Sequence, residues 1–171
     1  HALFRADANA AWTVDEELEK IPQLKELGVE FIEQPLAKDD WEGMKILFER
    51  SPLPLIADEA CVLENDVEKC QGHFHGINIK LTKCGGITPA RRMIDKARGL
   101  DMKVMVGCMN ESTIGSAAIA HLLPLLDYVD MDGPLLLAED VAEGLHFDYG
   151  TVRASSDPGL GIRLLQSLAT I

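Results

Sequence analysis

Cysteine is scarce in this 171-residue chain, and the positions of the four residues exclude two common classes of small protein. No two of them form a Cys-x-x-Cys pair, so the sequence indicates neither a disulfide framework nor a structural zinc site. We expect four reduced, partly buried thiols and a cytoplasmic location. These cysteines are Cys61, Cys70, Cys84 and Cys108.

Positive charge and long apolar runs are also scarce. The chain has 16 basic and 28 acidic residues, and the formal charge of −12 repels nucleic acids and anionic membrane surfaces. No apolar run approaches the roughly 18 residues that a membrane-spanning helix needs, and no signal-peptide pattern opens the chain. The expected partners are therefore small molecules and cations, with no nucleic acid and no membrane.

The chain is also too short for two full domains. With 47% hydrophobic residues, it suffices for one ordinary domain with a sizeable core, which we expect to span residues 1–171. The chain starts at His1, inside a strand-like pattern and not at Met, which suggests that an N-terminal portion precedes it.

Six short apolar runs recur along the chain and predict strands. Each ends in a polar residue or a glycine, and the ends of successive runs are 22 to 27 residues apart. That spacing matches a strand, a helix and two loops, so a βα repeat explains it. The runs are Leu3–Asp7, Val29–Glu33, Leu55–Asp58, Ile77–Lys80, Val104–Gly107 and Tyr128–Asp130.

Helical patterns fill the gaps between these runs. Thr13 and Glu16 form a capping box, the apolar residues that follow keep helical spacing, and Gly28 marks the C-terminal stop. Pro89 and Gly99 frame another helix. Besides the first helix, we expect helices at Asp40–Arg50, Pro89–Arg98 and Thr113–Leu123, with one or two turns at Asn65–Gln71.

The alternation of strands and helices predicts a parallel sheet that is buried on both faces. A doubly wound sheet and a barrel share this pattern. Five of the six strands end in a charged residue, and a barrel brings all strand ends to one mouth whereas an open sheet spreads them out. We therefore expect an α/β fold of the TIM type, a (β/α) barrel.

Three carboxylates close the first three strands: Asp7, Glu33 and Asp58. The ends of adjacent barrel strands lie about 5 Å apart, so these side chains can share one octahedral oxygen site of the kind that Mg²⁺ prefers. A single acidic residue at a strand end is usually a helix cap or a solvent contact. Three in consecutive repeats favour a metal site.

Lys80 ends the fourth strand, inside the sequence INIKLTKCGG. Beside a bound Mg²⁺ and partly desolvated, its amine would favour the neutral form that a general base requires. An ion pair with one of the three acids is the alternative. We place Lys83 in the following loop and interpret Gly85-Gly86 as a turn that leads to the helix at Pro89.

The sixth strand ends in YVDMDG, which holds two carboxylates with one residue between them. In extended backbone, Asp130 and Asp132 point to the same side and could clamp an ammonium group. A second cation site and solvated loop acids are the alternatives. His73 and His75 precede the fourth strand, so we assign them to the opposite end of the barrel and to a structural role.

Six motifs in this chain resemble those of the dipeptide epimerases, within the muconate lactonizing enzyme subgroup of the enolase superfamily. They occur in the family's order and spacing and cover nearly the whole chain. The motifs are DAN at 7–9, EQP at 33–35, ADE at 57–59, NIKLTKCGG at 78–86, GCMNES at 107–112 and DMD at 130–132.

The resemblance implies a metal-assisted proton transfer. Asp7, Glu33 and Asp58 would bind Mg²⁺, and Lys80 would be the acid/base on one face of the substrate α-carbon. An α-proton beside a carboxylate is very weakly acidic, so a cation on that carboxylate has to stabilise the enediolate. Two further residues would support the metal ligands: Asn9 and Glu59.

The resemblance also implies a substrate. Asp130 and Asp132 would bind the α-ammonium group of a dipeptide, and Glu111 would lie near the substrate. The reaction would be epimerisation of the C-terminal residue of a dipeptide such as Ala-Glu. Small residues would shape the pocket: Cys108, Met109 and Ile114.

The chain departs from this family in two ways. It has no Lys-x-Lys motif, which in the family supplies the base on the opposite face, and it lacks the first two barrel strands and the N-terminal capping domain. We expect six strands of an eight-strand barrel, whose exposed edges need the rest of the enzyme, in cis or as a companion chain. Alone, the chain should bind Mg²⁺ weakly and should not epimerise. The enzyme should be a homo-oligomer.

Two other functions stay open. A different enzyme of the subgroup, such as a cycloisomerase or a synthase, is opposed by the pair Asp130 and Asp132. A non-catalytic barrel scaffold is favoured by the missing Lys-x-Lys motif, and it is opposed by the intact acid triad and Lys80.

Overall fold

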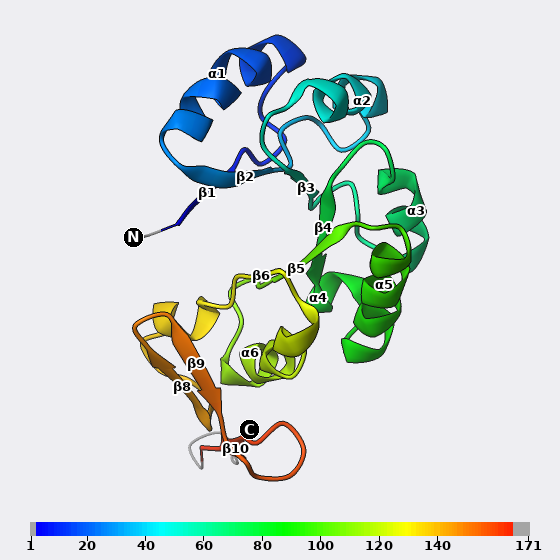
Figure 1. Cartoon of the computed structure of the whole chain (residues 1–171). Coiled ribbons are helices and arrows are strands. Elements are labelled where there is room, and N and C mark those ends of the chain that lie inside the picture. Colours follow the sequence, from blue (N-terminus) through cyan, green and yellow to red (C-terminus); the bar gives the residue numbers. More distant parts are fainter. Residues whose placement is uncertain (1–2, 166–171) are drawn as a thin grey trace.

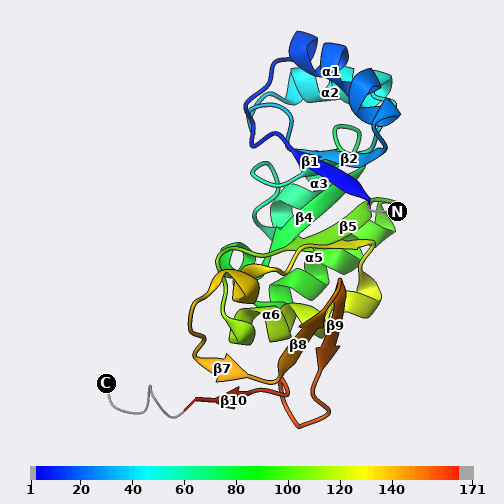
Figure 2. The ribbon, with the colours of Figure 1, turned by 90° about the vertical axis from the view of Figure 1, so that its left-hand side faces the viewer.

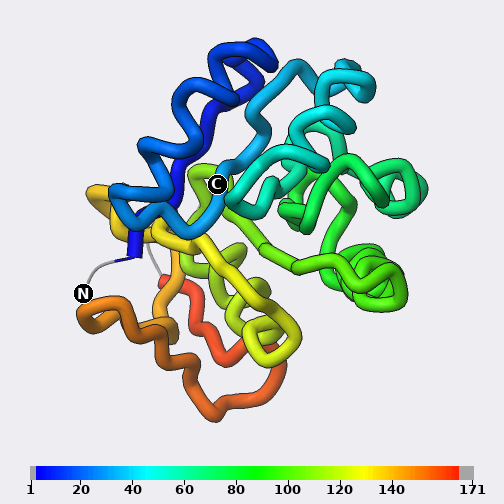
Figure 3. Tube along the Cα trace, turned by 45° about the horizontal axis from the view of Figure 1, so that its top comes forward, coloured from blue at the N-terminus to red at the C-terminus, as the bar shows by residue number. Residues whose placement is uncertain are grey.

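The computed structural model describes residues 3–165, and its centre is a parallel sheet of six strands in the order β1-β2-β3-β4-β5-β6. Each strand therefore pairs with the next one along the chain. The strands form an open arc with helices on its outer side (Figures 1 and 3). They are β1 (Phe4–Asp7), β2 (Val29–Glu33), β3 (Leu55–Ala57), β4 (Gly76–Lys80), β5 (Lys103–Gly107) and β6 (Tyr128–Val129).

This arrangement is a partial (β/α) barrel, as predicted, with β1 and β6 as its two edges. Helices and 3₁₀ turns connect the strands across the outside of the arc. The α-helices are α1 (Val14–Glu26), α2 (Trp41–Arg50), α3 (Val67–Cys70), α4 (Leu81–Cys84), α5 (Ile87–Gly99) and α6 (Thr113–Ala120). The 3₁₀ turns are η1 (Glu64–Asp66), η2 (Leu123–Leu125) and η3 (Gly133–Leu136).

Helix α1 begins and ends as its sequence predicts. The backbone N–H of Glu16 donates to Thr13 Oγ1 at 3.3 Å, and the backbone N–H of Thr13 donates to Glu16 Oε2 at 2.9 Å. These two bonds satisfy donors that the first helical turn leaves free. Gly28 follows the helix with a φ of +82°, a left-handed conformation that glycine adopts without strain.

Two predicted helix boundaries and the predicted placement of Lys83 were wrong. The helix expected from Pro89 begins at Ile87, since proline is tolerated within a first turn whose N–H groups have no helical partner. The helix expected to reach Leu123 stops at Ala120, and Pro124 lies in the separate turn η2. Lys83, expected in a loop, lies in α4 directly after β4.

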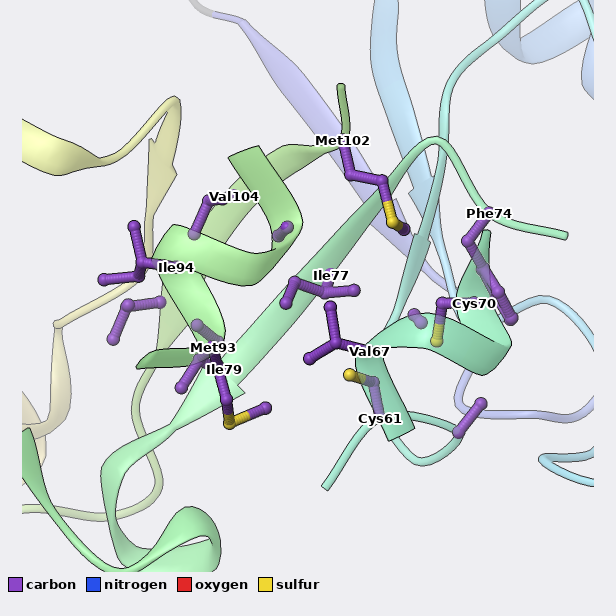
Figure 4. Close-up of a cluster of buried hydrophobic side chains, with 14 of the residues drawn as sticks. Cys61, Val67, Cys70, Phe74, Ile77, Ile79, Met93, Ile94, Met102 and Val104 are labelled. Carbon is purple, nitrogen blue, oxygen red and sulfur yellow. The ribbon is translucent and has the colours of Figure 1, made fainter. Parts of the chain in front are cut away.

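The main core lies between the sheet and its helices, as expected for strands whose side chains alternate between two faces. Ile77, Ile79 and Val104 point outward from β4 and β5 and contact Met93 and Ile94 of α5 (Figure 4). A smaller cluster lies on the inner face of the arc and consists of Phe31, Ile56 and Met105, with Tyr128 packed against it.

The C-terminal region adds four short strands that the sequence patterns did not predict: β7 (Ala142–Glu143), β8 (Leu145–Asp148), β9 (Thr151–Ala154) and β10 (Arg163–Leu164). β8 and β9 form an antiparallel hairpin beside α6 (Figure 2). Its two turn residues, Tyr149 and Gly150, have φ values of 44° and 79°, as tight hairpin turns require. None of the helices in residues 3–165 is long and apolar enough to cross a membrane.

Candidate active site

Four predicted site residues meet at the carboxyl ends of β1 to β4. Asp7 is the last residue of β1 and is paired in register with Glu33, the last residue of β2. Asp58 follows β3, and Lys80 ends β4. The parallel, sequential pairing of these strands brings the three carboxylates and the amine to one side of the half-barrel.

Glu33 is the most perturbed carboxyl group of this cluster. Its residue is only 6% exposed. Burial raises its pKa to about 7, and the negative charges of Asp7 and Asp58 act in the same direction, while the hydrogen bond from Asn78 opposes them. Two buried carboxylates, Glu33 and Asp58, and the exposed Asp7 therefore act on one another where negative charge is partly desolvated, which favours a bound cation.

Asn78 is a site residue that the sequence analysis missed. Its Nδ2 donates to Glu33 Oε1 at 2.6 Å, and its Oδ1 is buried without a partner among the described residues. A Cβ atom on Gly107 would stand 2.7 Å from Asn78 Nδ2, so this glycine leaves the space that the amide occupies. The sequence does place Asn78 at the site, because Asn78 and Lys80 are two residues apart on β4 and therefore share a face of the strand.

Asp58 is buried and holds two lysines at once. Lys80 Nζ donates to Asp58 Oδ2, and Lys83 Nζ lies 3.2 Å from Asp58 Oδ1. Gln34 Oε1 accepts hydrogen bonds from the backbone N–H groups of Asp58 and Ala60, at 3.0 and 3.2 Å, and fixes the loop after β3. The predicted alternative for Lys80, an ion pair with one of the acids, is thus what this geometry shows.

The protonation of Lys80 follows from this ion pair. Burial alone would lower the pKa of the amine, but the hydrogen bond and charge of Asp58, together with the charges of Glu33 and Glu59, outweigh it and the pKa is raised. Beside these acids Lys80 therefore carries its proton. It becomes a base only when the negative charge around it is neutralised.

The two predicted supporting residues lie beside this cluster. Asn9 has a φ of 48°, and its backbone N–H donates to Asp7 Oδ1 at 2.8 Å, so the turn after β1 orients the carboxylate. Glu59 is half-buried, and its Oε2 has no partner among residues 3–165. Asn9 thus contacts Asp7, and the charge of Glu59 acts on Lys80.

Asp130 and Asp132 lie after β6, on the other side of the mouth. One carboxylate oxygen from each lies within 4.8 Å of the other and of Cys108 Sγ, and this thiol donates to Asp132 Oδ1 at 3.6 Å. Burial and the charge of Asp132 raise the pKa of Asp130, and the positive charge of Lys80 acts against them. The pair can therefore receive an ammonium group or another cation.

Glu111, predicted to lie near the substrate, is a buried residue. The residue is 7% exposed, and its Oε1 accepts a hydrogen bond from the backbone N–H of Met109 at 3.3 Å. Its Oε2 is buried without a partner in the described part of the chain. A Cβ atom on Gly115 would come within 2.9 Å of this oxygen, and one on Gly133 within 2.7 Å of the backbone oxygen of Glu111.

His73 and His75 precede β4 and so lie at the amino ends of the strands, away from the mouth, as predicted. The backbone N–H of Leu55 donates to His75 Nδ1 at 3.1 Å, and the imidazole stacks on Phe48. Burial lowers the pKa of His75, which keeps the ring neutral and able to accept this bond.

The fold and the mouth together define a class: a (β/α) half-barrel with three carboxylates and an adjacent lysine at its strand ends. Residues 1–168 match the model of the enolase C-terminal domain-like family. The chain belongs to this family.

Known relatives agree with this assignment. The chain is 58% identical over 165 residues to the L-Ala-D/L-amino acid epimerase of Flavobacterium johnsoniae, and the match covers 96% of this chain and 49% of that protein. It is 39% identical over 161 residues to the hydrophobic dipeptide epimerase of Flavobacteria bacterium MS024-2A, with 94% and 46% covered. The chain thus spans about half the length of the curated relatives it matches.

Solved structures show the same architecture. The dipeptide epimerase of Cytophaga hutchinsonii, complexed with Mg and D-Ala-L-Val, matches with a TM-score of 0.89 at 29% identity, covering 96% of this chain and 46% of that one. The dipeptide epimerase of Methylococcus capsulatus, complexed with Mg and L-Arg-D-Lys, matches with a TM-score of 0.85 at 36% identity, covering 94% and 48%. Muconate lactonizing enzyme matches with a TM-score of 0.89 at 28% identity, covering 95% and 47%.

Proposed function

We propose that this chain is the C-terminal barrel portion of a Mg²⁺-dependent dipeptide epimerase, an isomerase that moves a proton at the carbon next to a carboxylate. The observation that carries the proposal is the meeting of three carboxylates and Lys80 at the ends of four consecutive strands, with the Asp130–Asp132 pair across the mouth. The similarity to dipeptide epimerases over nearly the whole chain supports it.

The residues present fit Mg²⁺. The donor set is three carboxylates, which are the oxygen ligands that this hard cation prefers. The raised pKa of Glu33 and the charges of its two acidic neighbours are the signature of a site that is short of positive charge. Asp7, Glu33 and Asp58 would hold the ion, which would supply the positive charge that stabilises an enediolate.

Lys80 is the proposed acid/base. Its Nζ is held at the mouth by Asp58, and its charge also acts on Asp130 across the mouth. The protonated form found here can donate a proton, and neutralisation of the surrounding acids is the condition under which it accepts one. Lys83 also contacts Asp58, so this carboxylate keeps a positive neighbour when Lys80 turns toward substrate.

The Asp130–Asp132 pair favours a dipeptide over the other substrates of the subgroup. Within residues 3–165 no basic residue forms an ion pair with either carboxylate, so the pair would attract the α-ammonium group of a dipeptide. A cycloisomerase or synthase acting on a substrate without that group has no use for such a pair. Fold similarity does not separate these functions, because a muconate lactonizing enzyme and a dipeptide epimerase match with the same TM-score.

The proposed enzyme contains more protein than these 171 residues. Both edges of the sheet lack a partner strand among the described residues. A cleft of about 470 Å³ beside β6 is lined by Val129, by Phe147 and Val152 of the hairpin and by the Asp130–Asp132 pair, so further chain that covers this cleft would also border the proposed substrate site. We propose that the N-terminal portion, in cis or as a companion, completes the barrel and supplies the base on the opposite face, and that the enzyme is a cytoplasmic homo-oligomer.

Incorporation of deuterium tests the proposal. Residues 1–171 would be joined to the N-terminal half of the Flavobacterium johnsoniae relative and incubated with Ala-Glu in D₂O, with and without Mg²⁺. We expect deuterium at the α-carbon of the second residue only with Mg²⁺, and its loss in Lys80→Met but not in the surface control Lys103→Met. Exchange without Mg²⁺, or undiminished exchange in Lys80→Met, would contradict the mechanism. Turnover by the 171-residue chain alone would refute the need for a second portion.

A further inference from the structure

The Asp130–Asp132 pair lies on a segment whose alternate residues are buried. Asp130 and Asp132 are exposed, whereas Met131 and Gly133 are buried. Met131 belongs to the main hydrophobic core. The two buried residues therefore anchor the segment, and the two carboxylates stay at the mouth.

Gly133 packs directly on the loop after β5, residues 108–112. A Cβ atom at this glycine would stand 2.7 Å from the backbone oxygen of Glu111 and 2.8 Å from its backbone nitrogen. The backbone oxygen of Met109 would lie 3.1 Å from the same Cβ. All three are backbone atoms, which cannot rotate away as the end of a side chain can. The close approach of the two loops thus requires glycine at position 133.

The loop after β5 is held in shape by its own hydrogen bonds. The backbone N–H of Glu111 donates to Met109 O at 2.8 Å, and the backbone N–H of Met109 donates to Glu111 Oε1 at 3.3 Å. Ser112 Oγ then caps α6 by accepting from the backbone N–H of Ile114 at 3.3 Å. The surface that Gly133 meets is therefore a closed turn fixed to the start of a helix.

Cys108 adds a second connection between the same two loops. Its Sγ donates to Asp132 Oδ1 at 3.6 Å and accepts a hydrogen bond from the backbone N–H of Gly133. A carboxylate oxygen of Asp130 lies within 4.8 Å of this sulfur. Burial raises the pKa of Cys108, and the charges of the two acids act in the same direction, so the thiol keeps the proton that it donates.

The pair needs such support because its members repel each other. The charge of Asp132 contributes to the raised pKa of Asp130, as expected for two carboxylates at close range. A flexible segment would let them separate, and an ammonium group would then have to draw them together at a cost in binding free energy. Contacts that hold the segment in place remove this cost before the substrate arrives.

These contacts are compatible with a completed barrel. They join the loops that follow β5 and β6, and these two strands already pair with each other in the sheet. Further strands would attach at the open edges, which belong to β1 and to the other side of β6. The joint between the two loops therefore does not occupy the place of any added strand.

We propose that Cys108 and Gly133 are positioning residues that seat the Asp130–Asp132 pair on the loop after β5 and so set the ammonium-binding end of the substrate site. Both act through Asp132 and not on the reacting carbon. The effect on substrate rests on the proposed function, in which this pair binds the α-ammonium group of a dipeptide. Displacing the seat should weaken recognition of the dipeptide and leave the metal end of the site unchanged.

Kinetics of the completed enzyme tests this effect, with residues 1–171 joined to the N-terminal half of the Flavobacterium johnsoniae relative. In Gly133→Ala, KM for Ala-Glu should rise about tenfold, while the deuterium exchange rate at saturating dipeptide and the Mg²⁺ concentration for half-maximal exchange each change less than about threefold. Cys108→Ala should raise KM about threefold, and Cys108→Ser should recover it, because a hydroxyl also donates and accepts. Gly99→Ala, with no atom within 4 Å of its new Cβ, is the control.

Several outcomes would overturn the proposal. An unchanged KM in both Gly133→Ala and Cys108→Ala would show that the seat does not position the pair. Equal changes in KM, saturated rate and Mg²⁺ dependence would show general destabilisation. If Gly133→Ala fails to fold, the Cys108 variants decide, since Cys108→Ala removes atoms and adds none.

Alkylation of Cys108 by iodoacetamide measures the joint itself, without metal or substrate. The rate at pH 8 would be followed by peptide mass spectrometry on the same joined enzyme. Gly133→Ala should react about threefold faster or more, because a displaced segment relieves the burial and negative charge that keep the thiol protonated. Asp132→Asn should also accelerate the reaction, and Gly99→Ala should not. An unchanged rate in Gly133→Ala would refute the joint. If the joined enzyme exchanges no deuterium, the proposed function fails, and the alkylation rates still decide whether the joint exists.

Discussion

Glu17 is a buried carboxylate without a hydrogen-bond partner in residues 3–165, and its replacement should stabilise the protein. The residue lies in α1 with an exposed fraction of 0%, and neither carboxylate oxygen has a partner among the described residues. Burial raises the pKa of Glu17 to about 7, and the positive charge of Lys20 offsets only part of this effect. The folded protein thus keeps a proton on Glu17 at pH values where the unfolded chain has lost it.

The sign and size of the effect follow from this difference. An ordinary Glu side chain has a pKa near 4.5, so between pH 4.5 and 7 the folded state binds the proton more tightly and loses stability as the pH rises. Each pKa unit corresponds to about 1.4 kcal/mol, which gives an upper bound of about 3 kcal/mol lost by pH 8. Glu17→Gln removes this titration, so its advantage over the parent chain should grow from near zero at pH 5 to about 1–3 kcal/mol at pH 8.

Urea unfolding at pH 5, 6, 7 and 8 in the absence of Mg²⁺ measures this advantage. Glu19→Gln, an exposed carboxylate on the same helix, is the matched control and should show no such trend. Glu33 also has a raised pKa and contributes to the pH dependence of the parent chain, but it is present in all three proteins and cancels in the differences. A Glu17→Gln advantage that is the same at pH 5 and pH 8 would refute the reasoning.

Three further predictions concern other contacts. Burial lowers the pKa of His75, so the contribution of this residue to stability is present above pH 6.5 and is lost as the pH falls. His75→Leu should therefore lose less unfolding free energy than the parent chain between pH 6.5 and 5, measured by urea titration. Gly107→Ala should lower the unfolding free energy by about 1–3 kcal/mol in the same assay and weaken Mg²⁺ binding in calorimetry, because the new Cβ displaces Asn78 from Glu33. Gly99→Ala is the control, since a Cβ at that position meets no other atom within 4 Å. Thr13→Ala should lower the unfolding free energy by about 1 kcal/mol through loss of the capping box, and an unchanged urea midpoint would contradict that role.

The part of the fold that repeats was predictable from the sequence. Six apolar runs with helical segments between them indicated sequential parallel strands, and their charged ends indicated a common mouth, because both are periodic signals. Asp7, Glu33 and Asp58 were identifiable for the same reason, since each ends a strand in successive repeats. The chain's membership in the enolase C-terminal domain-like family agrees with the motifs that these strand ends carry.

Features that depend on contacts between distant segments were not predictable. The bond from Asn78 to Glu33 spans 45 residues and the one from Arg5 to Val129 spans 124. The sequence places Asn78 on the same strand face as Lys80, but it carries no local pattern that identifies either bonding partner. The hairpin of β8 and β9 was missed because its strands are only four residues long and its turn residues, Tyr149 and Gly150, do not form one of the usual turn pairs. The second ion pair of Asp58, with Lys83, depends on the single turn of α4.

The strand order also has a consequence for how the protein folds. Asp7, Glu33, Asp58 and Lys80 come from four consecutive strands, so each pairing closes a loop of only about 25 residues, a small entropic cost. The proposed metal-binding side can thus assemble from the first half of the chain, before β5 and β6 are added. The bond of Arg5 to Val129 needs the last strand and closes late. Mg²⁺ present during refolding should therefore accelerate the early phase and leave the late one unchanged.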